Sequence, residues 1–360
     1  MYYKVRHYQY KNRIGNLRAE AVGVVSGEKH FPIFPGNMIF KPLTKSKPFS
    51  TPLYAYAEVF WSMIINEYFM PAPRYELAIC EGYEAANEKY LDYGTTVPMA
   101  YKEGENLLNL LEFFRKYPDE KVDIDNYVNY CQMFYDYRDI FEADFFQEHQ
   151  EMAEQLAMQV LISVLKGDQN YHYENVAFLC DKDGGIISLA PMIDHEFSTY
   201  FMFPDDISRH VYWLMELSKS IRGWEVRPGE YDNFKDPEER KLMEKSATCI
   251  HKNLLYIKEH YPQTTEEFLD KAEKLKTALT EASEDFLIRG NTEYSDCADS
   301  SAWLIGKARY KDKDEEKASA YEAELYGKGK KLDFRDVSIS AINEIKAVIS
   351  QMEEVLGKRE

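Results

Sequence analysis

The chain has 360 residues and a formal net charge of −18, with 62 acidic side chains against 44 Lys and Arg. This balance argues against a protein whose main partner is nucleic acid, because neutralising phosphates needs clustered Lys and Arg. The five cysteines are scattered and lack C-x-x-C spacing, so neither a disulfide framework nor a zinc site is indicated. No stretch approaches the roughly 18 apolar residues that span a bilayer. We therefore expect a soluble cytoplasmic protein that does not act at a membrane.

Residues 1–102 have a mostly β pattern, and we expect them to form a small N-terminal lobe. Strands are predicted where the sequence alternates or carries β-branched residues: Tyr2–Tyr10, Ala21–Val25, Asn37–Lys41 and residues 75–80. One helix is predicted from Leu53 to Tyr68, where apolar residues recur at helical spacing. Tyr93-Gly94 predicts a hairpin turn.

Residues 103–360 are mostly helical in pattern and predict a larger C-terminal lobe. The predicted helices are Glu105–Tyr117, Glu148–Lys166, one from a Thr264/Glu267 capping box to Gly290, and a final one that carries Ile342 to Leu356. Residues 176–180 and 186–190 predict a hairpin. Residues 306–331 interleave Lys with Glu and Asp, which is typical of a solvated helix or a mobile segment. The fold class expected is α+β.

The most informative segment is the run 167–175, Gly-Asp-Gln-Asn-Tyr-His-Tyr-Glu-Asn, which follows a strongly apolar predicted helix. Asp and Asn that merely satisfy turn backbone groups would explain an isolated loop of this kind. Here, however, an apolar hairpin follows and leads to Asp194. A carboxamide just after a turn and a carboxylate at the end of the next strand are oxygen ligands suited to Mg²⁺ on a nucleotide's phosphates. Asn175 and Asp194 are therefore the predicted metal ligands.

Upstream, Lys41 ends a predicted strand and Glu58 lies on the first predicted helix. A strand lysine positioned by a helix glutamate is suited to hold the α- and β-phosphates of a nucleotide. Each residue alone is most simply a surface side chain. The functional interpretation of the pair rests on the order of elements along the chain, which is strand lysine, helix glutamate, hairpin, helix, polar turn, hairpin, aspartate.

Residues 37–200 resemble the HipA-like serine/threonine protein kinases, whose catalytic segment runs G-N-x-D-x-H-x-x-N, then two short strands, then L-x-P-x-x-D. Gly167, His172 and Asn175 match this pattern in place, and Leu189-Ala190-Pro191-Met192-Ile193-Asp194 matches its end. Ile39-Phe40-Lys41-Pro42 looks like the family's phosphate-anchoring strand, and Tyr56-Ala57-Glu58 is similar to its helix. Residues 200–360 match only in being helical.

The resemblance implies a two-lobed, protein-kinase-like fold that binds ATP and Mg²⁺ and transfers the γ-phosphoryl group to a protein Ser or Thr hydroxyl. It implies that Lys41 holds phosphate oxygens and that His172 braces the catalytic loop. A hinge that includes Met99 and Tyr101 is expected, from topology, to bond the adenine. An antitoxin-like protein partner, as in some members of the family, is a further expectation.

At two positions the chain departs from the family pattern, because the catalytic Asp falls on Asn170 and the family's Asn falls on Asp168. Asn170 cannot act as a general base, since a carboxamide does not accept a substrate proton. We expect Asp168 to act as the general base instead. The alternatives are a pseudokinase that binds nucleotide and acts as an interaction module, and a small-molecule kinase, because a shared fold does not select the phosphate acceptor.

Two further features stay open. Residues 13–16 and 26–29 are candidates for a loop over the phosphates, although neither has G-x-G-x-x-G spacing and ordinary hairpin turns explain both. His195 and Glu196 beside Asp194 could form a transition-metal site with His172, because the residue types qualify. We rank that site below the magnesium site.

Overall fold

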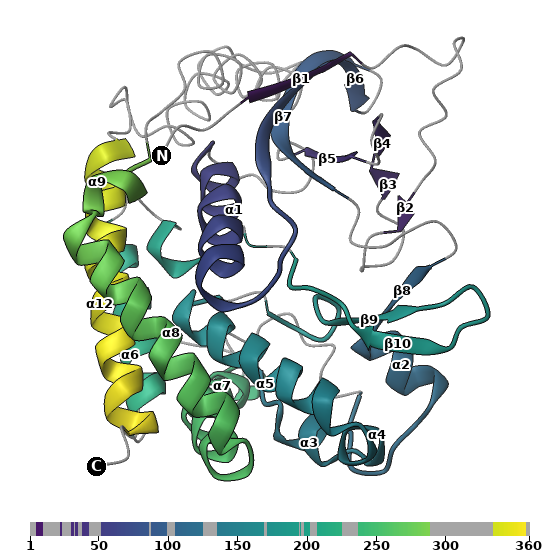
Figure 1. Cartoon of the computed structure of the whole chain (residues 1–360), viewed down its shortest axis with the longest axis vertical. Coiled ribbons are helices and arrows are strands. Elements are labelled where there is room, and N and C mark those ends of the chain that lie inside the picture. The colour runs from purple at the N-terminus through teal and green to yellow at the C-terminus, as the bar shows by residue number, and fades with distance from the viewer. Residues whose placement is uncertain are drawn as a thin grey trace.

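The computed structural model describes residues 5–9, 22–23, 30–31, 33–34, 38–42, 52–85, 88–98, 105–124, 135–168, 171–193, 195, 198–201, 207–224, 237–288 and 334–357. These residues form a mixed, mostly helical structure with small sheets (Figure 1). The strands are β1 (Val5–Gln9), β2 (Val22–Gly23), β3 (His30–Phe31), β4 (Ile33–Phe34), β5 (Met38–Pro42), β6 (Glu76–Ala85), β7 (Glu88–Pro98), β8 (Asn106–Asn109), β9 (Ala177–Cys180) and β10 (Ile186–Leu189).

The helices are α1 (Pro52–Ile64), α2 (Leu110–Lys116), α3 (Arg138–Glu142), α4 (Asp144–Glu148), α5 (Gln150–Leu165), α6 (Ile207–Arg222), α7 (Pro237–His260), α8 (Pro262–Glu281), α9 (Ser283–Phe286) and α12 (Phe334–Leu356). Two shorter elements join them, the π-helical turn η1 (Ile65–Phe69) and the 3-10 turn η3 (Thr199–Phe201). None of the helices in the described ranges combines the length and apolar character that a membrane span requires.

A five-stranded sheet with the order β1-β6-β7-β5-β4 positions Lys41. β1 runs parallel to β6, and the remaining neighbours are antiparallel. On β5, Ile39 and Lys41 share one face because side chains alternate along a strand. Ile39 is buried in the main core together with α1, so this face of the sheet is the one that α1 covers.

Two sequence-based assignments in this region are wrong. Tyr93-Gly94 does not form a turn: both residues lie inside β7, where Gly94 pairs with Ala78 on one side and Pro42 on the other. Pairing on both edges satisfies the backbone there, and a glycine within a strand allows close approach of neighbouring chains. Residues 106–109, expected to be helical, form β8 instead, because they pair with β9. Tertiary pairing outweighs local propensity in this segment.

The hairpin β9–β10 and the long helix α5 confirm the corresponding sequence predictions. The predicted helix start at Thr264 is wrong, since α8 begins at Pro262, a residue favoured in a first helical turn, and Thr264 lies inside the helix. The helix also ends at Glu281 instead of Gly290.

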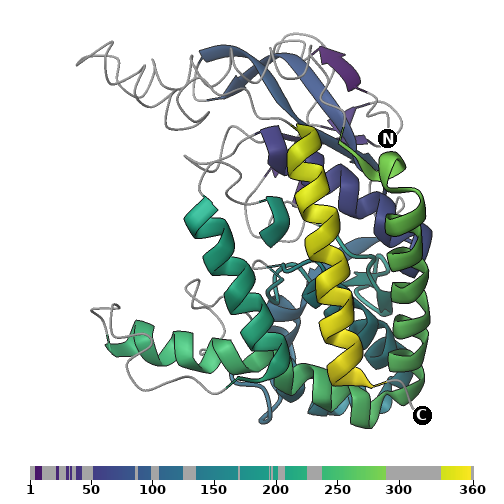
Figure 2. The ribbon, with the colours of Figure 1, turned by 90° about the vertical axis from the view of Figure 1, so that its left-hand side faces the viewer.

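The C-terminal helix α12 docks on the body as its single apolar stripe predicts. Its stripe of Ile342, Ile345, Ile349, Met352 and Leu356 is buried. Figure 2 shows α12 lying beside α8, to which it is joined by an ion pair between Lys276 Nζ and Glu353 Oε2 at 2.8 Å. The predicted charged segment 306–331 lies outside the described residues.

Candidate active site

Lys41 and Glu58 form an ion pair in which Nζ lies 2.6 Å from Oε1. The Glu58 side chain has no exposed surface, whereas that of Lys41 is 17% exposed. A buried carboxylate needs further donors, and the hydroxyl of Thr95 supplies one to Oε2 at 2.5 Å. Thr95 lies directly opposite Lys41 in the β5–β7 ladder. The sheet and α1 therefore hold the lysine in one position while part of its side chain stays exposed.

Helix α1, which carries Glu58, also packs on the turn η3. The rings of Phe60 and Phe201 lie 5.3 Å apart, and those of Trp61 and Tyr200 lie 6.0 Å apart, centre to centre. Thr199, at the start of η3, bonds to the carbonyl of Gly167 through its amide at 3.1 Å and its hydroxyl at 2.7 Å. Through η3, the helix of the ion pair is thus connected to the polar turn that begins at Gly167.

Gly167 has a φ of +57°, in the left-handed region that favours glycine. A Cβ at this position would lie 2.9 Å from both the Thr199 hydroxyl oxygen and Cδ2 of Leu217. The glycine is therefore required twice, for its backbone conformation and for the close approach of η3 and α6.

Asp168 lies in a buried cluster with two other ionisable side chains. Its Oδ2 atom is 2.7 Å from Nζ of Lys166, and the exposed fractions of these side chains are 1% and 0%. The same ammonium group lies 3.0 Å from Nδ1 of His195, which is also fully buried. A carboxylate held by an ammonium group inside the protein is a poor proton acceptor, because the pair stabilises its ionised form. The role of Asp168 as the general base stays a prediction, and in this structure its carboxylate is paired with Lys166.

The second half of the polar turn is fixed by a set of aromatic side chains. The hydroxyl of Tyr137 donates to the carbonyl of Tyr171 at 2.9 Å, and that of Tyr173 donates to the carbonyl of Asp136. The Tyr171 hydroxyl donates to Oε1 of Gln159 at 2.8 Å. Burial, with a smaller contribution from the charge of Asp168, raises the pKa of Tyr171 well above its ordinary value. Tyr171 therefore remains a hydrogen-bond donor.

His172 and Asn175 are held close together by this turn. The amide of Asn175 donates to the carbonyl of His172 at 2.8 Å, and Nδ1 of His172 accepts from the amide of Glu174 at 3.2 Å. The His172 ring stands edge-on to Tyr135, and the Asn175 residue is only 7% exposed. These contacts suit a bracing role for His172 and give Asn175 a fixed backbone.

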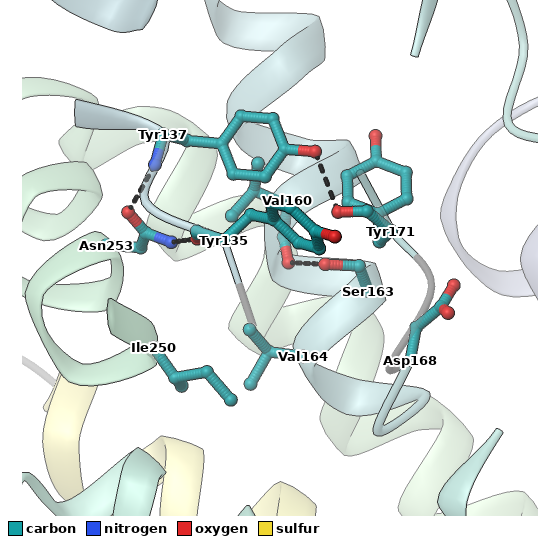
Figure 3. A pocket seen from close by; sticks show the side chains of 9 residues that line it. All are labelled: Tyr135, Tyr137, Val160, Ser163, Val164, Asp168, Tyr171, Ile250 and Asn253. Atoms are coloured by element: carbon teal, nitrogen blue, oxygen red, sulfur yellow. Dashed lines mark hydrogen bonds between the residues drawn. The ribbon is translucent and has the colours of Figure 1, made fainter. Parts of the chain in front are cut away.

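A small cavity lies behind the turn (Figure 3). Its volume is about 20 Å³, which suits about one water molecule. It is lined by Tyr135, Tyr137, Val160, Ser163, Val164, Asp168, Tyr171, Ile250 and Asn253. Among these, Asn253 accepts from the amide of Tyr137 at 2.9 Å and donates to the carbonyl of Tyr135 at 2.7 Å. The cavity is too small for a nucleotide, so it is part of the support of the turn.

Several of the predicted site residues lie outside the described residues: Asn170, Asp194, Met99, Tyr101, Glu196 and the two candidate phosphate loops. Their expected roles stay predictions. Three residues that contact the site were not predicted from the sequence: Thr95, Gln159 and Lys166. Lys166 carried a weak signal, because it follows an apolar helix and precedes Asp168 by two residues, but a lysine at a helix end is usually solvated.

Two predicted site residues among those described keep the chemical types that their expected roles need. Lys41 is a partly exposed cation held by Glu58, and Asn175 carries a carboxamide, whose oxygen is a ligand type that Mg²⁺ accepts. Their roles in binding a nucleotide and Mg²⁺ stay predictions. Among the described residues, no three His, Cys, Asp or Glu side chains gather to hold a metal ion. One ring nitrogen of His195, a member of the alternative transition-metal set, already accepts a hydrogen bond from Lys166.

Neither a protein-family model nor a curated protein sequence matches the chain. Among solved structures, the chain is similar to the Helicobacter pylori proinflammatory kinase CtkA, with 13% sequence identity and a TM-score of 0.41. The alignment covers 86% of this chain and 95% of that chain. A TM-score this low does not establish a common fold.

Proposed function

We propose that the protein is a cytoplasmic, HipA-like, ATP- and Mg²⁺-dependent kinase that phosphorylates a Ser or Thr hydroxyl of a protein. The observation that supports this most is the Lys41–Glu58 ion pair, at 2.6 Å, formed between a strand and the helix that covers it. A surface lysine has no need of a fully buried glutamate. A lysine that must meet phosphate oxygens at one fixed position does.

Each residue of the site has a part in this proposal. Lys41 offsets phosphate charge, and Glu58 with Thr95 keeps its ammonium group in place. Asn175 and Asp194 would hold Mg²⁺, which would supply charge neutralisation on the nucleotide's phosphates. His172 braces the turn, and Met99 and Tyr101 line the adenine site. In the reaction, the acceptor oxygen bonds to the γ-phosphorus, the bond from that phosphorus to the β,γ-bridging oxygen breaks so that ADP leaves with the electron pair, and the hydroxyl proton passes to solvent water.

A second function is favoured by one specific observation, the burial of Asp168 against Lys166. With that carboxylate occupied and Asn170 unable to accept a proton, the turn lacks an obvious base. Phosphoryl transfer relies mainly on positioning and charge neutralisation, so binding of ATP does not require the base. The second candidate is therefore a pseudokinase, a nucleotide-binding module that presents a surface to a protein partner, such as an antitoxin-like protein.

Thermal unfolding with and without ATP and Mg²⁺ tests the shared part of both proposals. A ligand that binds only the native state raises the apparent melting temperature. We expect a rise for the wild type and little or none for Lys41→Met. Lys121→Met is the matched control, because Lys121 forms an equally short ion pair with Asp144, at 2.6 Å, on the exposed surface. Absence of any rise in the wild type would overturn both proposals.

Release or transfer of phosphate then separates the two candidates. An active kinase transfers the γ-phosphoryl group of labelled ATP to protein, and Asp194→Asn abolishes the transfer. A pseudokinase shows the same thermal response to ATP and Mg²⁺ without turnover. Transfer that continues at the wild-type rate in Asp194→Asn would contradict the kinase proposal.

A further inference from the structure

Lys166 is a fully buried lysine that the proposed chemistry does not use directly. It caps the C-terminal end of α5, and its side chain has no exposed surface. A buried ammonium group is costly unless a carboxylate and further acceptors surround it. Here Nζ is 2.7 Å from Oδ2 of Asp168 and 3.0 Å from Nδ1 of His195. The lysine thus joins two segments, the start of the polar turn and the segment after β10.

The contact with His195 has a clear direction. An ammonium group only donates hydrogen bonds, so Nδ1 of His195 is the acceptor. On another side, the ring meets the aromatic ring of Tyr75 edge-on, 5.7 Å away between centres. His195 is therefore held by a charge-assisted hydrogen bond and an aromatic contact, both in the interior.

His195 directly follows Asp194, the predicted magnesium ligand. Beyond it, the chain bonds to the same turn again: the Ser198 hydroxyl donates to the carbonyl of Lys166 at 2.8 Å, and the Thr199 hydroxyl donates to that of Gly167 at 2.7 Å. Of these three contacts, the hydrogen bond between Lys166 and His195 is the nearest to Asp194 in the sequence.

We propose that Lys166 is a positioning residue of the nucleotide site: through His195 it ties the segment that follows β10 to the turn that carries Asn175. Asp168 serves to offset the charge of Lys166. This role explains why position 168 holds an aspartate where the HipA-like pattern has an asparagine, since a carboxamide would leave the buried ammonium group without a counter-charge. The inference deepens the proposed function and rests on it, because positioning matters only if Asp194 binds the metal.

A charge-balanced double variant separates positioning from stability. Lys166→Met alone leaves the Asp168 carboxylate buried without its cation, so loss of folding would explain any defect. Lys166→Met with Asp168→Asn removes both charges at nearly constant size and is expected to melt close to the wild type. It also removes the bond to His195. We expect the Mg²⁺ concentration needed for half-maximal stabilisation by ATP to rise about tenfold, as for other changes beside a metal ligand.

The matched control is Lys276→Met with Glu353→Gln, which removes an ion pair of 2.8 Å between α8 and α12. This pair joins α8 to α12 and includes no residue of the turn or of the segment after β10, so its removal should leave the Mg²⁺ requirement unchanged. His195→Leu keeps the Lys166–Asp168 pair and removes its link to the segment, together with the ring contact to Tyr75, and it should reproduce the raised Mg²⁺ requirement. If the double variant does not fold, the His195→Leu variant is used in its place to test the proposal.

Amide hydrogen exchange gives a readout that does not depend on nucleotide. The Thr199 amide donates to the carbonyl of Gly167, so its exchange should become faster in the double variant while that of α5 is unchanged. A double variant that folds, with wild-type Mg²⁺ requirement and wild-type exchange at Thr199, would overturn the inference. A wild type that does not respond to ATP and Mg²⁺ would instead overturn the proposed function, and the exchange result alone would then decide whether Lys166 orders the segment.

Discussion

The hydroxyl of Thr95 donates a hydrogen bond to Oε2 of Glu58, the same carboxylate whose Oε1 binds Lys41. The strand next to Lys41 therefore helps to hold the glutamate that positions it. We expect Thr95→Val to lower the free energy of unfolding by about 1.5–3 kcal/mol, the usual value for a hydrogen bond to a charged group. The Kd for ATP should rise about fivefold, equivalent to roughly 1 kcal/mol.

Thr96, the neighbour of Thr95 in the sequence, supplies the control for Thr95→Val. The Thr96 hydroxyl is also buried, but it donates to the backbone carbonyl of Ile39, not to Glu58. Thr96→Val should cost about 1 kcal/mol of stability and leave the Kd for ATP unchanged. Calorimetry for binding and urea unfolding for stability measure both quantities. Equal effects of the two variants on ATP binding would contradict the positioning role of Thr95.

Gly167→Ala and Gly184→Ala form a second matched pair. Both glycines have positive φ, +57° and +86°, so alanine costs about 1–2 kcal/mol at each for the backbone alone. At Gly167 the new Cβ also meets Thr199 and Leu217 at 2.9 Å, whereas at Gly184 it meets only the end of the Lys116 side chain at 4.0 Å. We expect Gly167→Ala to be less stable than Gly184→Ala by about 1–3 kcal/mol in urea unfolding. Equal losses would show that η3 does not pack closely on the turn.

The sequence predicted those elements whose local pattern agrees with their tertiary partners. The apolar stripe of α12 and the hairpin β9–β10 are of this kind. It failed at Tyr93-Gly94 and at residues 106–109, where pairing with strands distant in sequence decides the structure. The proximity of Lys41 and Glu58 could be expected from their order along the chain. The roles of Lys166 and Thr95 could not be predicted from the sequence. Whether a lysine or a threonine is buried depends on the tertiary structure, and no local sequence pattern indicates it.

Gln159 joins the polar turn to the end of β10. Its carboxamide accepts from the Tyr171 hydroxyl and donates to the carbonyl of Ala190, both at 2.8 Å, and all three groups are buried. Gln159→Leu leaves both partners without their hydrogen bond to Gln159. Each loss should lower the free energy of unfolding by about 1–3 kcal/mol. Adding Tyr171→Phe removes one of the two orphaned groups, so the double variant should lose less than the sum of the single variants. Strict additivity in urea unfolding would contradict the linkage.

Alkaline pH should destabilise the protein partly through Tyr261. Burial, aided by Tyr256 and Glu154, raises the pKa of Tyr261 to about 12. In the unfolded chain, tyrosine ionises near pH 10, so the unfolded state releases its proton first. The stabilisation is fully present below about pH 10 and is lost as the pH rises through about 12. Tyr261→Phe should make the fall in stability across this range shallower, and an unchanged slope would contradict the assignment.

A crystal structure with a non-hydrolysable ATP analogue and Mg²⁺ tests the central claim most directly. We expect Nζ of Lys41, still paired with Glu58, to contact phosphate oxygens, and the metal to be bound by the carboxamide of Asn175 and the carboxylate of Asp194. A nucleotide bound elsewhere, or an Asp194 side chain directed away from Asn175 with the nucleotide in place, would contradict the account.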